Sequence, residues 1–270
     1  RGFCPSCGGR RMAQTAAHLV DHIIPRVPVR QWVLSLPIPL RYLLAAHPRL
    51  ITPVLQVIHR AISTSLIKQA GLKRSEAQTG AITLIQRFGS AANLNIHLHC
   101  LVLDGVYRIQ NGVAEFHSAR SPTTEQLQRL LSQIIQRIMK ALTRKGALIE
   151  EEGMSYLAEM ETDAALSPLQ SAACTYRIAL GRRAGQKVLT LKTISTQNTQ
   201  PQENKKYCVN AHGFSLHAGV RCAMNQRKEL EHLCRYITRP AIANERLTRN
   251  KDGQIVLKLK TPYRDGTTHI

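Results

Sequence analysis

Two histidines separated by a single leucine form the pattern in this sequence with the clearest chemical potential. His97 and His99 lie in the apolar run 94–103, whose composition is typical of a strand. Because successive side chains of a strand point to opposite faces, both imidazoles project from one face and can seat a divalent cation. The alternative is that the two histidines are hydrogen-bonded polar residues on a half-exposed strand, with no metal bound.

Two imidazoles leave a divalent cation short of ligands, so a third ligand is expected on a neighbouring element. His217 is the first choice because it lies in the strand-like run 213–222, shortly before a helical segment. It fits a hydrogen-bonded strand histidine equally well. His232 and Glu229 are the alternatives on that helix.

The helical segment 225–239 has an apolar stripe with Tyr236 at its flank. Residues three and four positions apart share a helix face, so the Tyr236 hydroxyl can reach past the edge of the core. The alternative is a tyrosine packed at that edge.

Cys4 and Cys7 are spaced like half of a zinc ribbon, and the glycines that follow them suit a tight turn. The next cysteine is Cys100, so we expect residues 1–11 to be a remnant of such a ribbon. Residues 12–270 then form the main domain. Cys4 and Cys7 would be the zinc ligands of this half site.

Alternating and helical apolar periods predict a mixed α and β chain. The strand 79–89 precedes the histidine strand after a short link, which predicts an antiparallel pair at the centre of the sheet. A strand at 30–37 is expected to end at Pro37. The remaining expected elements are helices at 48–68 and 123–145, a strand at 254–260 and a polar loop at 193–206.

The charge balance indicates a polyanionic partner. The chain has 37 Lys and Arg against 17 Asp and Glu, which gives a net charge of +20, and such an excess favours nucleic acid. The sequence has no apparent run of roughly 20 apolar residues and no signal peptide. The seven cysteines do not resemble a disulfide framework. A cytoplasmic protein without a membrane partner is expected.

The chain resembles the rolling-circle insertion-sequence transposases of the HUH superfamily, in its single-tyrosine branch. The similarity covers nearly the whole chain and lies in four segments. They are Cys4-Pro5-Ser6-Cys7-Gly8, Gln31 to Pro37, Gln78 to Tyr107 with Asn95-Ile96-His97-Leu98-His99, and Leu230 to Leu247 with Arg235-Tyr236-Ile237-Thr238-Arg239-Pro240. The last of these is the most specific.

The resemblance implies an α+β fold, with a central antiparallel sheet and helices on its faces. It implies that Tyr236 is the nucleophile, and that His97, His99 and a third ligand bind Mg²⁺ or Mn²⁺. The product would be a 5′-phosphotyrosine on single-stranded DNA, and the protein would act on element ends and a target during rolling-circle transposition. Basic residues near Tyr236 would contact the DNA, namely Arg227, Lys228, Arg235 and Arg239.

Two other functions stay open. One is a catalytically inactive DNA-binding remnant, since the chain lacks upstream cysteines and ends at Ile270, as expected of a truncated copy. The other is a metal-dependent hydrolase that uses water. The three differ in whether a covalent adduct forms and whether Tyr236 is needed for it.

Overall fold

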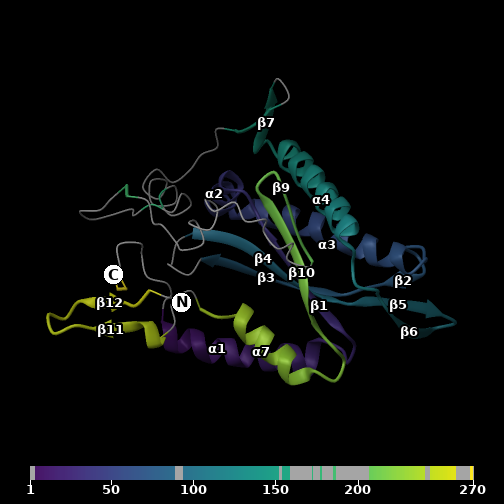
Figure 1. Cartoon of the computed structure of the whole chain (residues 1–270), viewed down its shortest axis with the longest axis horizontal. Coiled ribbons are helices and arrows are strands. Elements are labelled where there is room, and N and C mark those ends of the chain that lie inside the picture. Colours follow the sequence, from purple (N-terminus) through teal and green to yellow (C-terminus); the bar gives the residue numbers. More distant parts are fainter. Residues whose placement is uncertain are drawn as a thin grey trace, which may run out of the picture.

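The computed structural model describes residues 4–88, 94–151, 154–158, 172, 177, 185–186, 207–240, 244–259 and 268–269. Its centre is a five-stranded sheet in which every neighbouring pair is antiparallel. The order is β3 (Ala81–Phe88), β4 (Leu94–Leu103), β1 (Val29–Ser35), β10 (Phe214–Cys222) and β9 (Cys208–Ala211). Helices cover both faces of this sheet (Figure 1). The predicted α+β fold is confirmed.

The strand β1 occupies the middle of the sheet, and side chains on both of its faces are buried. Trp32 and Leu34 belong to one core cluster, while Val29 belongs to the other. The prediction that the hairpin at 79–103 lies at the centre is therefore wrong, since β3 is an edge strand. Its antiparallel pairing with β4 is confirmed. β3 and β4 are close together in the sequence, whereas only long-range contacts place β1 against β4.

One face of the sheet carries three helices and the larger core. They are α2 (Ile38–Ala46), α3 (Ile51–Gln69), preceded by the short turn η2 (Pro48–Leu50), and α4 (Thr124–Arg144). The predicted helix at 123–145 is confirmed, and it begins with a capping box of Thr123 and Gln126 that satisfies free amides of the first turn. The helix α2 was not predicted from the sequence, because Pro37 indicated only the end of a strand.

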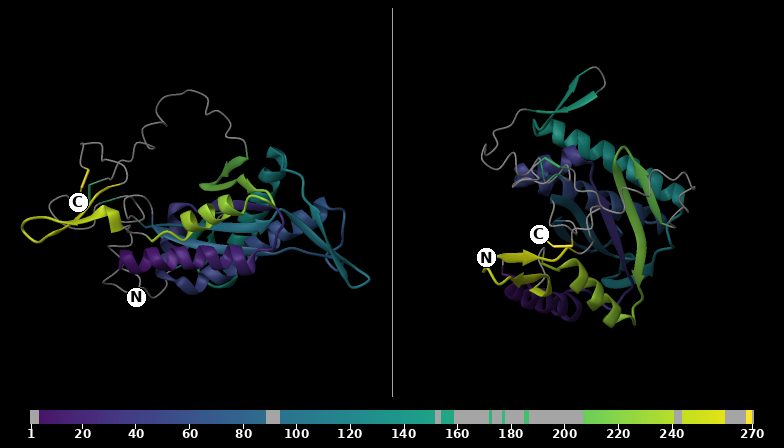
Figure 2. Two further views of the ribbon diagram at one scale, coloured as in Figure 1. Left: turned by 90° about the horizontal axis from the view of Figure 1, so that it is seen from below. Right: turned by 60° about the vertical axis from the view of Figure 1, so that its left-hand side comes forward.

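The opposite face is covered by α7 (Arg227–Ile237) and by α1 (Pro5–His18), which continues as the π-helical turn η1 (Leu19–Ile23) (Figure 2). The two helices pack on each other and on the sheet. Gly8 lies inside α1, where a Cβ would come 2.9 Å from Cβ of Pro240. The glycines after the cysteines therefore do not make the expected tight turn. Gly8 instead allows α1 to approach the end of α7.

Three small sheets surround the centre. The first contains β2 (Ala77–Gln78), β5 (Gly105–Gln110) and β6 (Val113–Ser118). The second pairs β7 (Leu148–Glu151) with β8 (Met154–Leu157), and the third pairs β11 (Leu247–Arg249), which follows η3 (Asn244–Arg246), with β12 (Ile255–Leu257). The strand predicted at 254–260 is thus shorter and lies outside the central sheet.

A buried ion pair joins the central sheet to the first small sheet. Asp104 lies between β4 and β5 and binds Arg30 of β1 at 2.8 Å and Arg221 of β10 at 2.6 Å. These contacts give Asp104 a structural role. Gly105 is required beside it, because a Cβ there would lie 2.2 Å from the His117 carbonyl oxygen.

The segment Pro48–Gln69 is long and apolar enough to cross a membrane by length and composition, contrary to what the sequence reading expected. Seven side chains of α3 are buried, and α3 packs on α4, so most of this apolarity belongs to the core. The loop predicted at 193–206 lies outside the described residues.

Candidate active site

His97 and His99 lie side by side on the face of β4 that is turned toward α7. Their ring centroids are 4.9 Å apart with the planes at 61°. His99 is 5% exposed, and His97 is partly exposed. The shared face follows from the two-residue period of the strand, so this expectation of the sequence is confirmed.

The backbone sets the protonation of the His97 ring. Its Nδ1 lies 2.7 Å from the carbonyl oxygen of Asn95, and a carbonyl oxygen can only accept. Nδ1 therefore carries the hydrogen, and Nε2 has a free lone pair. Histidines that bind metals are commonly oriented in this way.

Gln31, a central residue of β1, orients the His99 ring. Its amide nitrogen lies 2.8 Å from His99 Nδ1, and Gln31 is itself 4% exposed. The His99 Nε2 atom is buried, and within the described part of the chain no hydrogen-bond partner reaches it. If the Gln31 amide presents its oxygen to Nδ1–H, the buried Nε2 becomes a free ligand atom. An orphaned buried nitrogen in the ring next to that of His97 fits a bound cation.

Burial keeps both rings neutral, as metal ligands must be. It lowers the pKa of His99 to about 4, with the neighbouring His97 ring as a smaller cause. The pKa of His97 is also lowered, first by burial, while the bond to Asn95 opposes this effect and Arg41 adds to it. At neutral pH no proton competes with a cation at this pair.

Tyr236 of α7 faces the histidine pair. Its ring centroid is 6.5 Å from that of His99, with the planes at 81°, and the guanidinium of Arg239 lies 5.1 Å from the Tyr236 ring centroid. The side chain of Tyr236 is 49% exposed, so its hydroxyl is open to a substrate. Leu230, Cys234 and Ile237 are buried beneath it and hold the helix on the sheet.

Two polar anchors fix the ends of α7. Gln86 of β3 donates through Nε2 to the carbonyl oxygen of Ile237 at 2.8 Å. At the other end, Arg227 donates to the carbonyl oxygens of Val20, Ile24 and Pro25, around the end of η1. The guanidinium of Arg227, expected on DNA, is thus engaged in positioning the helix.

The other basic residues expected on DNA lie on or just beyond α7, and their side chains are exposed. Arg235 forms an ion pair with Glu231 at 2.6 Å, Lys228 lies in the first turn, and Arg239 follows the helix. Their contact with DNA stays a prediction.

The structure places the third-ligand candidates apart from the pair. His99 pairs with Val33, which pairs with His217 on its other side, so His217 shares the face but lies one strand beyond. His232 and Glu229 are exposed on α7. Among the described residues, no group of three His, Cys, Asp or Glu side chains is placed to hold a metal. His217 as a ligand stays a prediction.

Gln31 was missed by the sequence reading. A long amide in the apolar stretch 29–36 was the available signal, because a buried amide needs a hydrogen-bond partner. The buried amide indicated that Gln31 has a hydrogen-bond partner. It could not identify His99 as that partner, because His99 lies on another strand.

Cys4 and Cys7 are both exposed at the start of α1. Hydrogen bonds from Cys7 lower the pKa of Cys4, and the amide of Cys7 lies 3.5 Å from Cys4 Sγ. An exposed thiol with a lowered pKa suits a metal ligand. Zinc binding and the domain boundary at residue 11 stay predictions.

Comparison with known proteins gives one family. A family model described as "Putative transposase" matches residues 80–270, a span that begins at β3 and includes both histidines and Tyr236. No curated protein matches the chain. The residues before this span include β1 with Gln31, and α1, against which α7 packs.

Proposed function

The chain belongs to this transposase family, and from that premise we propose that it cleaves and rejoins single-stranded DNA through Tyr236. The proposed activity requires Mg²⁺ or Mn²⁺ at His97 and His99 and serves rolling-circle transposition, with element ends and a target as substrates. We place the protein in the cytoplasm, in contact with DNA.

The observation that carries the proposal is the position of Tyr236 beside the His99 imidazole, whose neighbour on the same strand is His97. The phenol and the His99 ring are 6.5 Å apart between centroids, close enough for one phosphodiester group to contact both. Tyr236 comes from a helix and His99 from a strand, and the rigid backbone of both elements favours a fixed attack geometry.

The reaction would exchange one phosphodiester for another. The Tyr236 Oη atom bonds to phosphorus, the P–O3′ bond breaks, the phenol proton passes to solvent and the leaving 3′ oxygen takes up a proton. A cation on Nε2 of His97 and His99 would neutralise the charge on the non-bridging oxygens. The guanidinium of Arg239, 5.1 Å from the Tyr236 ring centroid, would bring positive charge close to the substrate phosphate. Reversal joins a new 3′ hydroxyl without an energy source.

The test is formation of a covalent DNA adduct. We expect the chain, with Mn²⁺ and single-stranded oligonucleotides that carry a candidate element end, to give a product heavier by one DNA fragment. Tyr236→Phe should abolish it. Tyr156→Phe is the matched control, because Tyr156 is also exposed, at 46%, but lies on β8 away from the helix α7.

Two other outcomes would identify the alternatives. Cleavage that persists without an adduct in Tyr236→Phe would show a hydrolase that uses water. DNA binding without any cleavage would indicate an inactive remnant. The latter is favoured by one observation, namely that the described residues bring together two of the metal-ligating side chains rather than three.

A further inference from the structure

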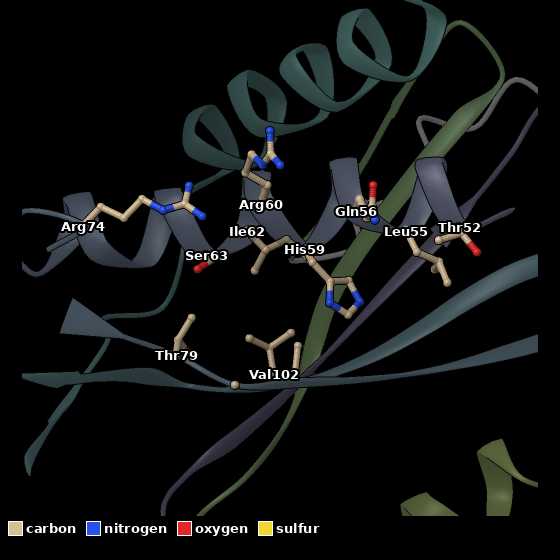
Figure 3. A pocket seen from close by; sticks show the side chains of 12 residues that line it. Thr52, Leu55, Gln56, His59, Arg60, Ile62, Ser63, Arg74, Thr79 and Val102 are labelled. Carbon is tan, nitrogen blue, oxygen red and sulfur yellow. The ribbon is translucent and has the colours of Figure 1, made fainter. Parts of the chain in front are cut away.

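A basic groove lies on the face of the central sheet opposite Tyr236. It has a volume of about 450 Å³ between α3 and the strands β3 and β4 (Figure 3). His99 and Leu101 of β4 face α7, whereas Val102 of the same strand lines this groove. Because neighbouring strand residues point to opposite faces, the groove cannot be part of the cleavage site.

The lining of the groove combines positive charge with polar and apolar groups. Arg60 and Arg74 are exposed at its edge, and none of the described residues that line it is acidic. Thr52, Gln56 and Ser63 are polar, and Val102 is buried below them. Its volume is in the range of sites for small ligands.

His59 points from α3 toward the strands (Figure 3). Thr83 donates its hydroxyl hydrogen to Cys100 Sγ at 3.1 Å, so it accepts from His59 Nε2, 2.5 Å away. In that tautomer Nδ1 carries no hydrogen and is an acceptor. Burial lowers the pKa of His59, which favours the neutral ring. An acceptor is of no use to a phosphate but suits the amino group of a nucleobase.

We propose that this groove binds a second stretch of the same DNA, with phosphates on Arg60 and Arg74 and a base above the apolar floor. This rests on the proposed function. A small anion would need enclosed donors, whereas two exposed guanidinium groups on a chain of net charge +20 suit a polyanion that releases counterions on binding. The two faces of the central sheet would then bind different segments of one DNA strand.

The test measures binding of a long single-stranded oligonucleotide over a range of salt concentrations, with Tyr236→Phe in every variant. Each phosphate contact contributes about 0.7 to the slope of log K against log salt for single strands. Arg60→Ala with Arg74→Ala should therefore make the slope shallower by about 1.4. The control is Arg137→Ala with Lys140→Ala, which removes the same charge from exposed positions of α4. Its slope should change by less than half as much.

Three results would overturn the inference. They are an unchanged slope, an equal loss in the control, and displacement of the DNA by inorganic phosphate at constant ionic strength, which would mark a site for a small anion. A thermal melt of each variant checks the fold.

The outcome is separate from that of the proposed function. With Tyr236 restored, the Arg60 and Arg74 double variant should still form the adduct on a short oligonucleotide that reaches only one face. If no protein formed the adduct but the groove still bound DNA, the proposed nuclease activity would be rejected and the proposed DNA-binding groove would be supported.

Discussion

The Tyr236 ring stands nearly perpendicular to the His99 imidazole, at 81° and with 6.5 Å between the ring centroids. Tyr236 is exposed while His99 is buried, so the proposed nucleophile lies on the solvent side of the proposed metal ligand. The Tyr236 side chain is thus accessible to a substrate phosphate from solvent. Substitutions of the side chains around these two rings should therefore have different effects on catalysis, metal binding and stability.

Arg239 should matter more than Arg235, although both are basic and close to Tyr236. The Arg239 guanidinium lies over the Tyr236 ring, whereas that of Arg235 is paired with Glu231. We expect Arg239→Ala to lower the rate of adduct formation by roughly ten- to a hundredfold, as expected for the loss of one charge next to a reacting oxygen. Arg235→Ala should cost less than a few-fold. Equal losses, measured in single-turnover assays, would contradict the role assigned to Arg239.

Gln31 should control metal affinity without being a ligand. Gln31→Ala removes the amide beside His99 Nδ1, and loss of such an orienting contact lowers metal affinity by about 10- to 100-fold. Gln31→Glu keeps an oxygen acceptor and should retain most of the affinity. Titration calorimetry with Mn²⁺ and no DNA measures this directly. Equal affinity in Gln31→Ala and the unchanged chain would show that the ring needs no such support.

Acid should destabilise the fold through His99. Its pKa is about 4 in the folded chain and about 6.5 when unfolded, so between these values the unfolded state binds more protons. The free energy of unfolding should therefore fall as the pH drops from about 6.5 toward 4, by roughly 3 kcal/mol at most. His99→Gln should flatten this part of the urea-derived profile. A profile of the same slope in that variant would mean that other groups cause the loss.

Asp104 should contribute to stability rather than to catalysis. Asp104→Asn leaves the guanidinium of Arg30 buried without its counter-ion, which costs about 3–5 kcal/mol when a buried pair is broken. Asp252→Asn is the control, because Asp252 lies exposed in a turn. Urea denaturation of both variants gives the comparison. Similar urea midpoints for the two variants would show that the ion pair does not stabilise the fold.

Short-range rules determined much of the local structure. The alternation of a strand placed His97 and His99 on one face, and the apolar stripe of the helix placed Tyr236 at its flank. Thr123 marked the start of α4 because its hydroxyl caps the helix. Each of these features depends on residues only a few positions apart. They can therefore be predicted from the local sequence without knowledge of the rest of the chain.

Only the tertiary structure decided what lies against these elements. It put β1 rather than the histidine hairpin in the middle of the sheet, brought Gln31 to His99, engaged Arg227 with the end of η1, and buried Asp104 between two arginines. Each contact joins residues far apart in the chain, and no local period encodes it. Such partners are selected by the summed burial and hydrogen bonding of the whole fold, so a single strand or helix pattern cannot specify them.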